Sequence, residues 1–288
     1  MQTLSFSLVD VFACQILSGN SLSIFEHDAP LSVDLMQRLT REMRQFESIF
    51  VQRLGDARLA ARIFTMEEEL PFAGHPVIGA AAYWHARHAP DAQQLSISMQ
   101  LGERSADIVS RRDGDSFFAE MDQGRAEFGA PLSEAESAMY LSCFGLDAAD
   151  REATLPLQVV STGLPYLILP IRSGLARARI EVADLEARLA AIGAKFAFVL
   201  DVAAREGRTW DNDGRVEDIA TGSAAGPAAA YLYAHGCLDG EAVTLHQGRF
   251  LGRPSELHAR ILRQGEARHV MVGGQVWMVG EGQLRIPA

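Results

Sequence analysis

Two glycine turns carry most of the residues that could do chemistry in this chain of 288 residues. The first is Ala73-Gly74-His75, which opens an alanine-rich segment ending at Tyr83. The second is Thr221-Gly222-Ser223, which opens a similar segment ending at Tyr231. In each turn the glycine permits a sharp change of direction, and the alanines that follow predict a helix. Backbone N–H groups and the positive end of such a helix dipole would stabilise an anion or an oxygen that gains negative charge.

Glu47 is the first candidate for acid/base work, since it lies between Phe46 and Ile49 in a segment that predicts a strand. Burial among apolar side chains would raise the pKa of its carboxyl group, which suits a group that takes and returns a proton near neutral pH. The same alternation also fits a glutamate at a strand edge that faces water, so both interpretations stay open. His75 is the second candidate. A loop histidine beside glycine is more often structural, but a helix N-terminus would keep its imidazole neutral.

Asp218 and Ser223 flank the second turn. Locally, the sequence favours a turn residue for Asp218 and a helix N-cap for Ser223. Their interest comes from an internal repeat, because Glu217–Tyr231 matches Glu69–Tyr83 at an offset of 148 residues. A fainter match joins residues 18–24 to residues 162–168, at an offset of 144. A repeat of half the chain predicts duplicated domains.

Strands and helices are mixed without a steady alternation, which predicts an α+β fold with mainly antiparallel sheets. We expect an N-terminal domain of residues 1–124, joined by a C-terminal strand at 276–288, and a second domain of residues 125–275. Gly273-Gly274 is expected to form a hairpin turn.

The composition excludes several classes of partner. Twenty-six basic and 37 acidic residues give a net charge of −11, which argues against nucleic acid and against anionic membrane surfaces. The three cysteines are odd in number and widely spaced, and with no signal peptide or transmembrane run recognised they predict a cytoplasmic protein. No dinucleotide or phosphate-loop fingerprint is present, so no cofactor is expected. His85 and His88 are interpreted as solvated side chains, because no cysteine or carboxylate cluster completes a metal site.

Taken together, these residues resemble the PhzF-like isomerase family of phenazine biosynthesis. The resemblance extends over nearly the whole chain and rests on the following segments: Asp10-Val11-Phe12, Gly19-Asn20, Arg41-Glu42-Met43 with Glu47, Phe64-Thr65, Glu69 to Pro76, Asp218, Ala220 to Ala224, Gly226-Pro227, Gln247-Gly248 and Gly252 to Ser255.

The resemblance implies a diaminopimelate-epimerase-like fold, with two similar pseudo-symmetric domains that each curl a mostly antiparallel sheet around a central helix. It also implies a proton shuttle without cofactor or metal, acting on a small carboxylated metabolite at the domain interface of what is often a homodimer. Glu47 matches the family's acid/base residue. The remaining residues match positions around the substrate: His75 and Asp218 as further catalytic groups, with Gly74, Gly222, Ser223, Asn20 and Thr221 as binding residues.

Three residues depart from the family pattern, namely Phe46, Met66 and Ile219, and we expect them to affect which substrate is used. Related racemases use one cysteine at each glycine turn, whereas both turns here lack cysteine, which argues against two-thiol chemistry. Two alternatives stay open. One is a non-catalytic binding protein, and the other is an epimerase that uses glutamate and histidine in place of thiols.

Overall fold

The computed structural model describes residues 2–264 and 267–287. The chain divides into two compact units, one made of residues 1–122 with 273–288 and the other of residues 123–272. These boundaries lie two or three residues from those expected from the sequence. The architecture is α+β and dominated by strands, so the predicted fold class is confirmed.

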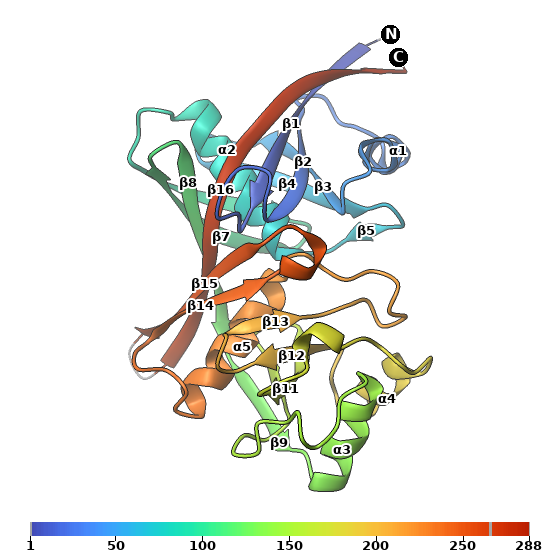
Figure 1. Cartoon of the computed structure of the whole chain (residues 1–288). Coiled ribbons are helices and arrows are strands. Elements are labelled where there is room, and N and C mark those ends of the chain that lie inside the picture. Colours follow the sequence, from blue (N-terminus) through green and yellow to red (C-terminus); the bar gives the residue numbers. More distant parts are fainter. Residues whose placement is uncertain (1, 265–266, 288) are drawn as a thin grey trace. The chain divides into compact units, whose positions relative to one another are not determined.

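In the first unit, strands close into a barrel. Their order is β1-β2-β3-β4-β6-β7-β8-β16, and β16 pairs with β1 again, as the red and blue strands of Figure 1 show. Most pairings are antiparallel, and two are parallel, β2 with β3 and β4 with β6. The elements are β1 (Gln2–Val11), β2 (Asn20–Glu26), α1 (Val33–Met43), β3 (Glu47–Arg53), β4 (Arg58–Thr65), β5 (Glu69–Leu70), α2 (Gly74–His88), β6 (Gln94–Leu101), β7 (Arg104–Asp113), β8 (Ser116–Arg125) and β16 (Ala267–Ile286).

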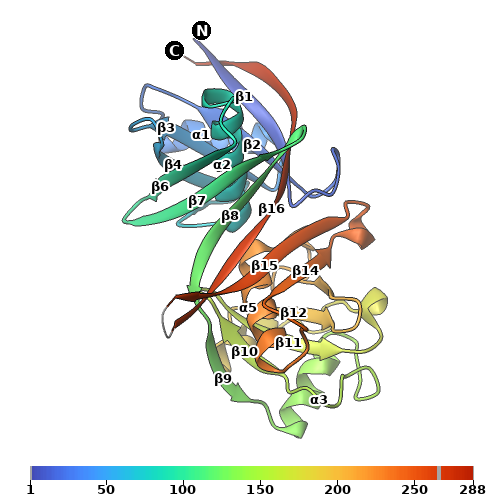
Figure 2. The ribbon, with the colours of Figure 1, turned by 90° about the vertical axis from the view of Figure 1, so that its left-hand side faces the viewer.

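Helix α2 is the centre of this barrel. Every residue from Gly74 to His85 is buried, and strands β1, β2, β3, β6 and β7 all pack against the helix (Figure 2). Small side chains allow this close approach. A Cβ atom on Gly79 would lie 2.6 Å from Cδ2 of Leu22 and 2.8 Å from Cγ2 of Val11, so the helix fits only with glycine there.

Helix α1 lies against the opposite face of the strands. Phe25, Phe50 and Phe64 form an aromatic row beneath it, with the first two rings stacked at 4.8 Å. The hydroxyl of Ser32 accepts a hydrogen bond from the backbone N–H of Leu35 and so caps the N-terminus of this helix.

The second unit builds an open sheet in the order β15-β14-β13-β12-β11-β10-β9. Helix α5 packs against β10, β11, β12, β14 and β15 of this sheet, and its residues from Gly222 to Leu232 are buried except Ser223. The elements are β9 (Glu127–Pro131), α3 (Glu134–Cys143), β10 (Gln158–Ser161), β11 (Pro165–Ile171), η1 (Leu175–Arg177), α4 (Leu185–Ala191), β12 (Phe196–Asp201), β13 (Glu206–Arg208), α5 (Gly222–Ala234), β14 (Ala242–Gln247), η2 (Arg249–Leu251) and β15 (Ser255–Gln264).

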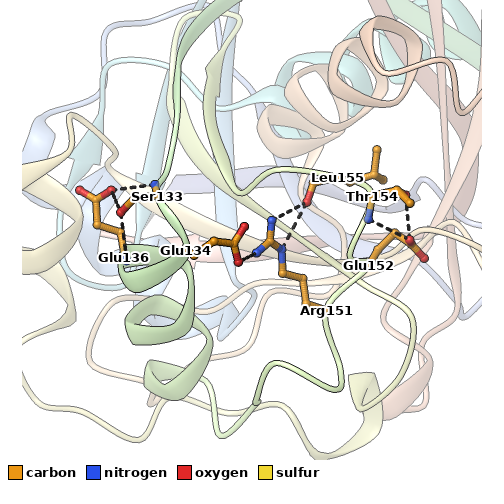
Figure 3. A network of polar contacts seen from close by, with 7 residues as sticks. All are labelled: Ser133, Glu134, Glu136, Arg151, Glu152, Thr154 and Leu155. Carbon is orange, nitrogen blue, oxygen red and sulfur yellow. Dashed lines mark hydrogen bonds and ion pairs between the residues drawn. The ribbon is translucent and has the colours of Figure 1, made fainter.

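Polar contacts fix the start of α3 at the outer side of this unit (Figure 3). The hydroxyl of Ser133 accepts from the backbone N–H of Glu136, and the Glu136 carboxylate accepts from the backbone N–H of Ser133 at 2.8 Å. Arg151 donates to Glu134 at 2.6 Å and to the backbone carbonyl of Leu155. The capping box formed by Ser133 and Glu136 satisfies N–H groups that a free helix end would leave unpaired.

The two units repeat the same order of elements. The parallel pair β2/β3 around α1 corresponds to β11/β12 around α4, and the parallel pair β4/β6 around α2 corresponds to β13/β14 around α5. Within these pairs, Glu47 lies opposite Leu22, whereas Phe196 lies opposite Tyr166. Since residues 18–24 match residues 162–168, Phe196 occupies in the second unit the place that Glu47 has in the first.

Two expectations from the sequence are wrong. Gly273 and Gly274 lie inside β16 rather than in a hairpin turn, because a Cβ atom on Gly273 would lie 2.5 Å from the carbonyl oxygen of Ala119 on β8. His85 is fully buried rather than solvated. Its Nδ1 lies 3.0 Å from the Ser110 hydroxyl and its Nε2 lies 3.0 Å from the Ala92 carbonyl oxygen, since strands surround the helix end.

Candidate active site

The first unit brings Glu47 and His75 into contact. Glu47 is the first residue of β3, and His75 is the second residue of α2. Nδ1 of His75 lies 3.3 Å from Oε2 of Glu47, with 6% and 7% of the respective side chains exposed. Of the two interpretations of Glu47, the buried one is correct, because the closed barrel leaves no water-facing edge at β3.

Burial also sets the charge of His75. Loss of hydration lowers the pKa of its imidazole from 6.5 to about 3, so the ring is neutral at neutral pH. Nε2 of the ring is buried and has no hydrogen-bond partner among the described residues. A neutral imidazole can donate at one nitrogen and accept at the other. The ring therefore contacts Glu47 through Nδ1 and keeps Nε2 available for a further polar group.

The first helix turn adds backbone groups to this pair. No side chain caps the N-terminus of α2, where the chain enters through Ala73 in an extended conformation. Gly74 is itself buried, so the turn brings main-chain N–H groups next to His75. Asn20, the first residue of β2, is 1% exposed and lies opposite Val11 in the β1/β2 ladder.

The second glycine turn forms a hydrogen-bonded loop. The Thr221 hydroxyl donates to Oδ2 of Asp218 at 2.5 Å, and the backbone N–H of Ala220 donates to Oδ1 at 3.3 Å. Gln247 holds this loop from β14, since its amide contacts the backbone of both Asp218 and Thr221. These bonds give the Asp218 carboxylate a fixed orientation.

At the start of α5, Ser223 forms a hydrogen bond with Tyr166. The hydroxyl groups of Ser223 and Tyr166 lie 2.8 Å apart, and Tyr166 is buried on β11. The N-cap of α5 is Thr221 rather than Ser223, and neither α2 nor α5 has a side-chain cap. The Gly222 carbonyl accepts from the Gln123 amide at 2.8 Å. The Ser223 hydroxyl is therefore oriented by a phenol and does not serve as a helix cap.

The predicted site residues thus fall into two groups. Glu47, Gly74 and His75 gather at the N-terminus of α2, with Asn20 on β2 in the same unit, while the second group gathers at the N-terminus of α5 and contains Asp218, Thr221, Gly222 and Ser223. Two further residues were given no role from the sequence, Tyr166 and Gln247. The sequence signal for Gln247 was its place in the Gln247-Gly248 segment of the family resemblance, and in the structure Gly248 has a φ of 81°, which marks a tight turn.

Two negative findings apply to the described part of the chain. Residues 2–264 and 267–287 contain no group of three or more histidine, cysteine or carboxylate side chains placed to hold a metal ion. Within these same ranges, no helix combines the length and the hydropathy needed to cross a bilayer.

Comparison with known proteins identifies the family. The family model described as "Phenazine biosynthesis-like protein" matches residues 9–282. The chain belongs to this family. Among phenazine biosynthesis-like relatives, a trans-2,3-dihydro-3-hydroxyanthranilate isomerase of Pseudomonas chlororaphis is 32% identical, over 97% of this chain and 98% of that protein. The predicted resemblance is therefore confirmed.

Solved structures of related proteins have the same fold as this chain. A predicted epimerase from Pseudomonas aeruginosa is 47% identical and superposes with a TM-score of 0.90, covering 99% of this chain and all of that one. A phenazine biosynthesis protein of the PhzF family from Bacillus anthracis has a TM-score of 0.83 at 22% identity, with coverage of 99% and 100%, and shows the shared fold. This member of the phenazine biosynthesis-like family is accordingly an enzyme of the isomerase and epimerase class.

Proposed function

We propose that the chain is a cofactor-independent isomerase that moves a proton between two atoms of a small carboxylated metabolite. Glu47 is the acid/base group. Its carboxylate removes a proton from a substrate carbon, the electron pair spreads into the conjugated substrate as an enolate-like charge, and the protonated Glu47 returns the proton to another carbon. The product has the same formula as the substrate, and no electrons are gained or lost.

The observation that carries this proposal is the buried contact between Glu47 and a neutral His75. A desolvated carboxylate is a stronger base than one in water, and a neutral imidazole can share a proton with it without adding a positive charge. The uncapped N-terminus of α2 supplies main-chain donors for the oxygen that gains charge.

The second glycine turn is proposed to hold the substrate and to orient it for the proton transfer. The Asp218 carboxyl group offers an acceptor that suits an ammonium or hydroxyl group, and Ser223 offers a hydroxyl donor at a helix N-terminus that suits a carboxylate. Whether both turns serve one substrate molecule, as the sequence predicts, stays a proposal. A homodimer likewise stays a proposal, and light scattering of the purified protein would test it.

Deuterium exchange tests the central step. Trans-2,3-dihydro-3-hydroxyanthranilate, named in the relatives' description, serves as probe in deuterated water, and proton NMR follows the ring positions. We expect the wild-type protein to incorporate deuterium and Glu47→Gln to incorporate none while keeping its circular dichroism spectrum. Glu69→Gln is the matched control, because Glu69 pairs with Arg62 at the surface and does not contact His75. Exchange at the wild-type rate in Glu47→Gln would show that another group moves the proton.

A second candidate is an epimerase, favoured by the 47% identical structure described as a predicted epimerase. The same groups would then remove and return a proton at one carbon. The two functions give different products, because an epimerase inverts a stereocentre whereas the proposed isomerase moves a double bond. The ultraviolet spectrum and optical rotation of the product separate them.

A further inference from the structure

Gln247 holds the second glycine turn through both ends of its side-chain amide. It is the last residue of β14 and is 2% exposed. Its Oε1 accepts from the backbone N–H of Thr221 at 3.0 Å. Its Nε2 donates to the backbone carbonyl of Asp218 at 2.8 Å and to the Thr221 hydroxyl at 2.9 Å.

These three bonds fix the direction of the hydrogen-bond chain. A backbone N–H can only donate, so the amide atom facing the Thr221 N–H must be the oxygen. The other amide atom is then the nitrogen, which can only donate, and the Thr221 hydroxyl must accept from it. The single proton of that hydroxyl is left to point along the 2.5 Å contact to Oδ2 of Asp218. Because Asp218 accepts there, its carboxylate oxygen carries no proton.

We propose that Gln247 is a positioning residue that directs the Thr221 hydroxyl onto Asp218 and so holds the Asp218 carboxyl group in one orientation toward the substrate. Gln247 acts through Thr221 and does not touch the substrate itself. The inference rests on the proposed function, since it assigns a purpose to the orientation of Asp218. It adds a distinct claim: the direction of the hydrogen bond between Thr221 and Asp218 depends on which end of the Gln247 amide faces the Thr221 hydroxyl.

Two substitutions separate this role from simple packing. Gln247→Glu keeps the shape of the side chain and can still accept from the Thr221 N–H, but it replaces the donor toward the Thr221 hydroxyl with a second acceptor. That acceptor competes with Asp218 for the hydroxyl proton. Gln247→Met keeps the volume and removes both polar ends. If Gln247 only filled space, the glutamate variant would disturb turnover little, whereas the positioning role predicts that it disturbs turnover at least as much as methionine does.

The matched control is Gln158, another buried glutamine of the same unit. Its amide donates to the Gly129 carbonyl at 2.7 Å, and its oxygen lies 3.0 Å from Nε2 of His235, away from the second glycine turn. Gln158→Met therefore removes a buried amide of the same kind without touching Thr221 or Asp218. Circular dichroism and thermal unfolding of both methionine variants define a temperature at which each is folded.

Kinetics with trans-2,3-dihydro-3-hydroxyanthranilate and crystal structures without substrate give two independent readouts. For Gln247→Met and Gln247→Glu we expect kcat to fall by about tenfold or more with a KM within about threefold of wild type, while Gln158→Met stays within about twofold. In a Thr221→Val background, adding Gln247→Met should lower kcat by less than about twofold, because Gln247 acts through the hydroxyl that Thr221→Val has already removed. In the crystal structure of Gln247→Met, the Thr221 hydroxyl should leave Asp218.

The proposal is overturned if Gln247→Glu keeps wild-type kcat, if the losses in the double variant multiply, or if Thr221 stays bonded to Asp218 in Gln247→Met. Asp218→Asn distinguishes this failure from failure of the proposed function. Wild-type kcat in Asp218→Asn would remove Asp218 from the mechanism, whatever Gln247 does. If the probe is not turned over, the crystal structure alone decides whether Gln247 holds Thr221 onto Asp218.

Discussion

Nδ1 of His75 lies 3.3 Å from Oε2 of Glu47, although the two residues come from different elements and are 28 positions apart in the sequence. The contact forms because α2 runs through a closed barrel and starts next to the beginning of β3. Both side chains are more than nine-tenths buried. The barrel thus creates a polar pair in surroundings where a charge on the imidazole is costly.

The neutral state of His75 predicts how stability changes with pH. In the folded protein burial lowers its pKa to about 3, while in the unfolded chain the pKa is near 6.5. Between these values the unfolded state binds the extra proton, so the free energy of unfolding falls as the pH decreases from about 6.5 to about 3. One proton gives a slope of up to about 1.4 kcal/mol per pH unit.

Urea unfolding between pH 7 and pH 4.5 measures this slope. His75→Gln keeps a polar side chain that does not titrate, so this variant should lose about 2 kcal/mol less than wild type over the same range. Equal slopes for the two proteins would mean that His75 takes up a proton in the folded state as readily as in the unfolded state.

The duplicated ion pairs give a prediction with its own control. Arg62 donates two hydrogen bonds to Glu69 in the first unit, at 2.7 and 2.6 Å, and Arg208 donates two to Glu217 in the second, both at 2.7 Å. The first pair is about 36% exposed, whereas the second is about 10% exposed and lies between the rings of Trp210 and Phe250.

Glu217→Gln should therefore cost much more stability than Glu69→Gln. Removing the buried carboxylate leaves the Arg208 charge without its counterion, which costs about 3 to 5 kcal/mol, while an exposed pair contributes about 1 kcal/mol or less. Thermal and urea midpoints of the two variants check this directly. Similar losses for both substitutions would contradict the ranking by burial.

The sequence predicts more of the fold than of the candidate site. The repeat predicted the two units, because glycine and tyrosine recur in register at an offset of 148 residues. The strand pattern left Glu47 open between buried and exposed, since its exposure depends on β4 and α2, which are distant in sequence. The burial of His85 could not be predicted either, because side chains at a helix end are usually exposed to solvent, whereas strands surround this helix end.

The second site group was harder to predict. Asp218 and Ser223 were found through the resemblance and the repeat, while local rules assigned them a turn and an N-cap. Gln247 comes from a strand 29 residues after Asp218 and carries no local signature of a loop anchor. Its role follows from three hydrogen bonds that only the fold brings together. Such a contact is set by strand order, which single-sequence periodicity does not encode.

The hydroxyl pair at the start of α5 predicts a binding effect. Tyr166 lies 2.8 Å from Ser223, so its phenol can donate to the serine and leave the serine proton for a substrate oxygen. Ser223→Ala should raise KM by about tenfold, in line with the loss of one hydrogen bond to a charged group, with a smaller change in kcat. Tyr166→Phe should raise KM by a smaller factor, because Ser223 keeps its own proton. A larger fall in kcat than rise in KM would place Ser223 in the chemical step instead.

The divergence of the two units predicts how the proton travels. The position of Glu47 on β3 is occupied by Phe196 on β12, so the second unit has no carboxylate at the matching register. Under the proposed function, Glu47 then both accepts the proton and returns it. Because Glu47 is 5% exposed, the proton that it takes from the substrate exchanges with water slowly, and part of that proton should reach the product.

An isotope-labelling experiment tests this. Trans-2,3-dihydro-3-hydroxyanthranilate deuterated at the reacting carbon, turned over in ordinary water to low conversion, should give product that retains part of the label, as measured by mass spectrometry. In a two-base mechanism one group removes the deuteron and another supplies a solvent proton, so complete loss of label in the earliest product would rule out a single shuttle at Glu47.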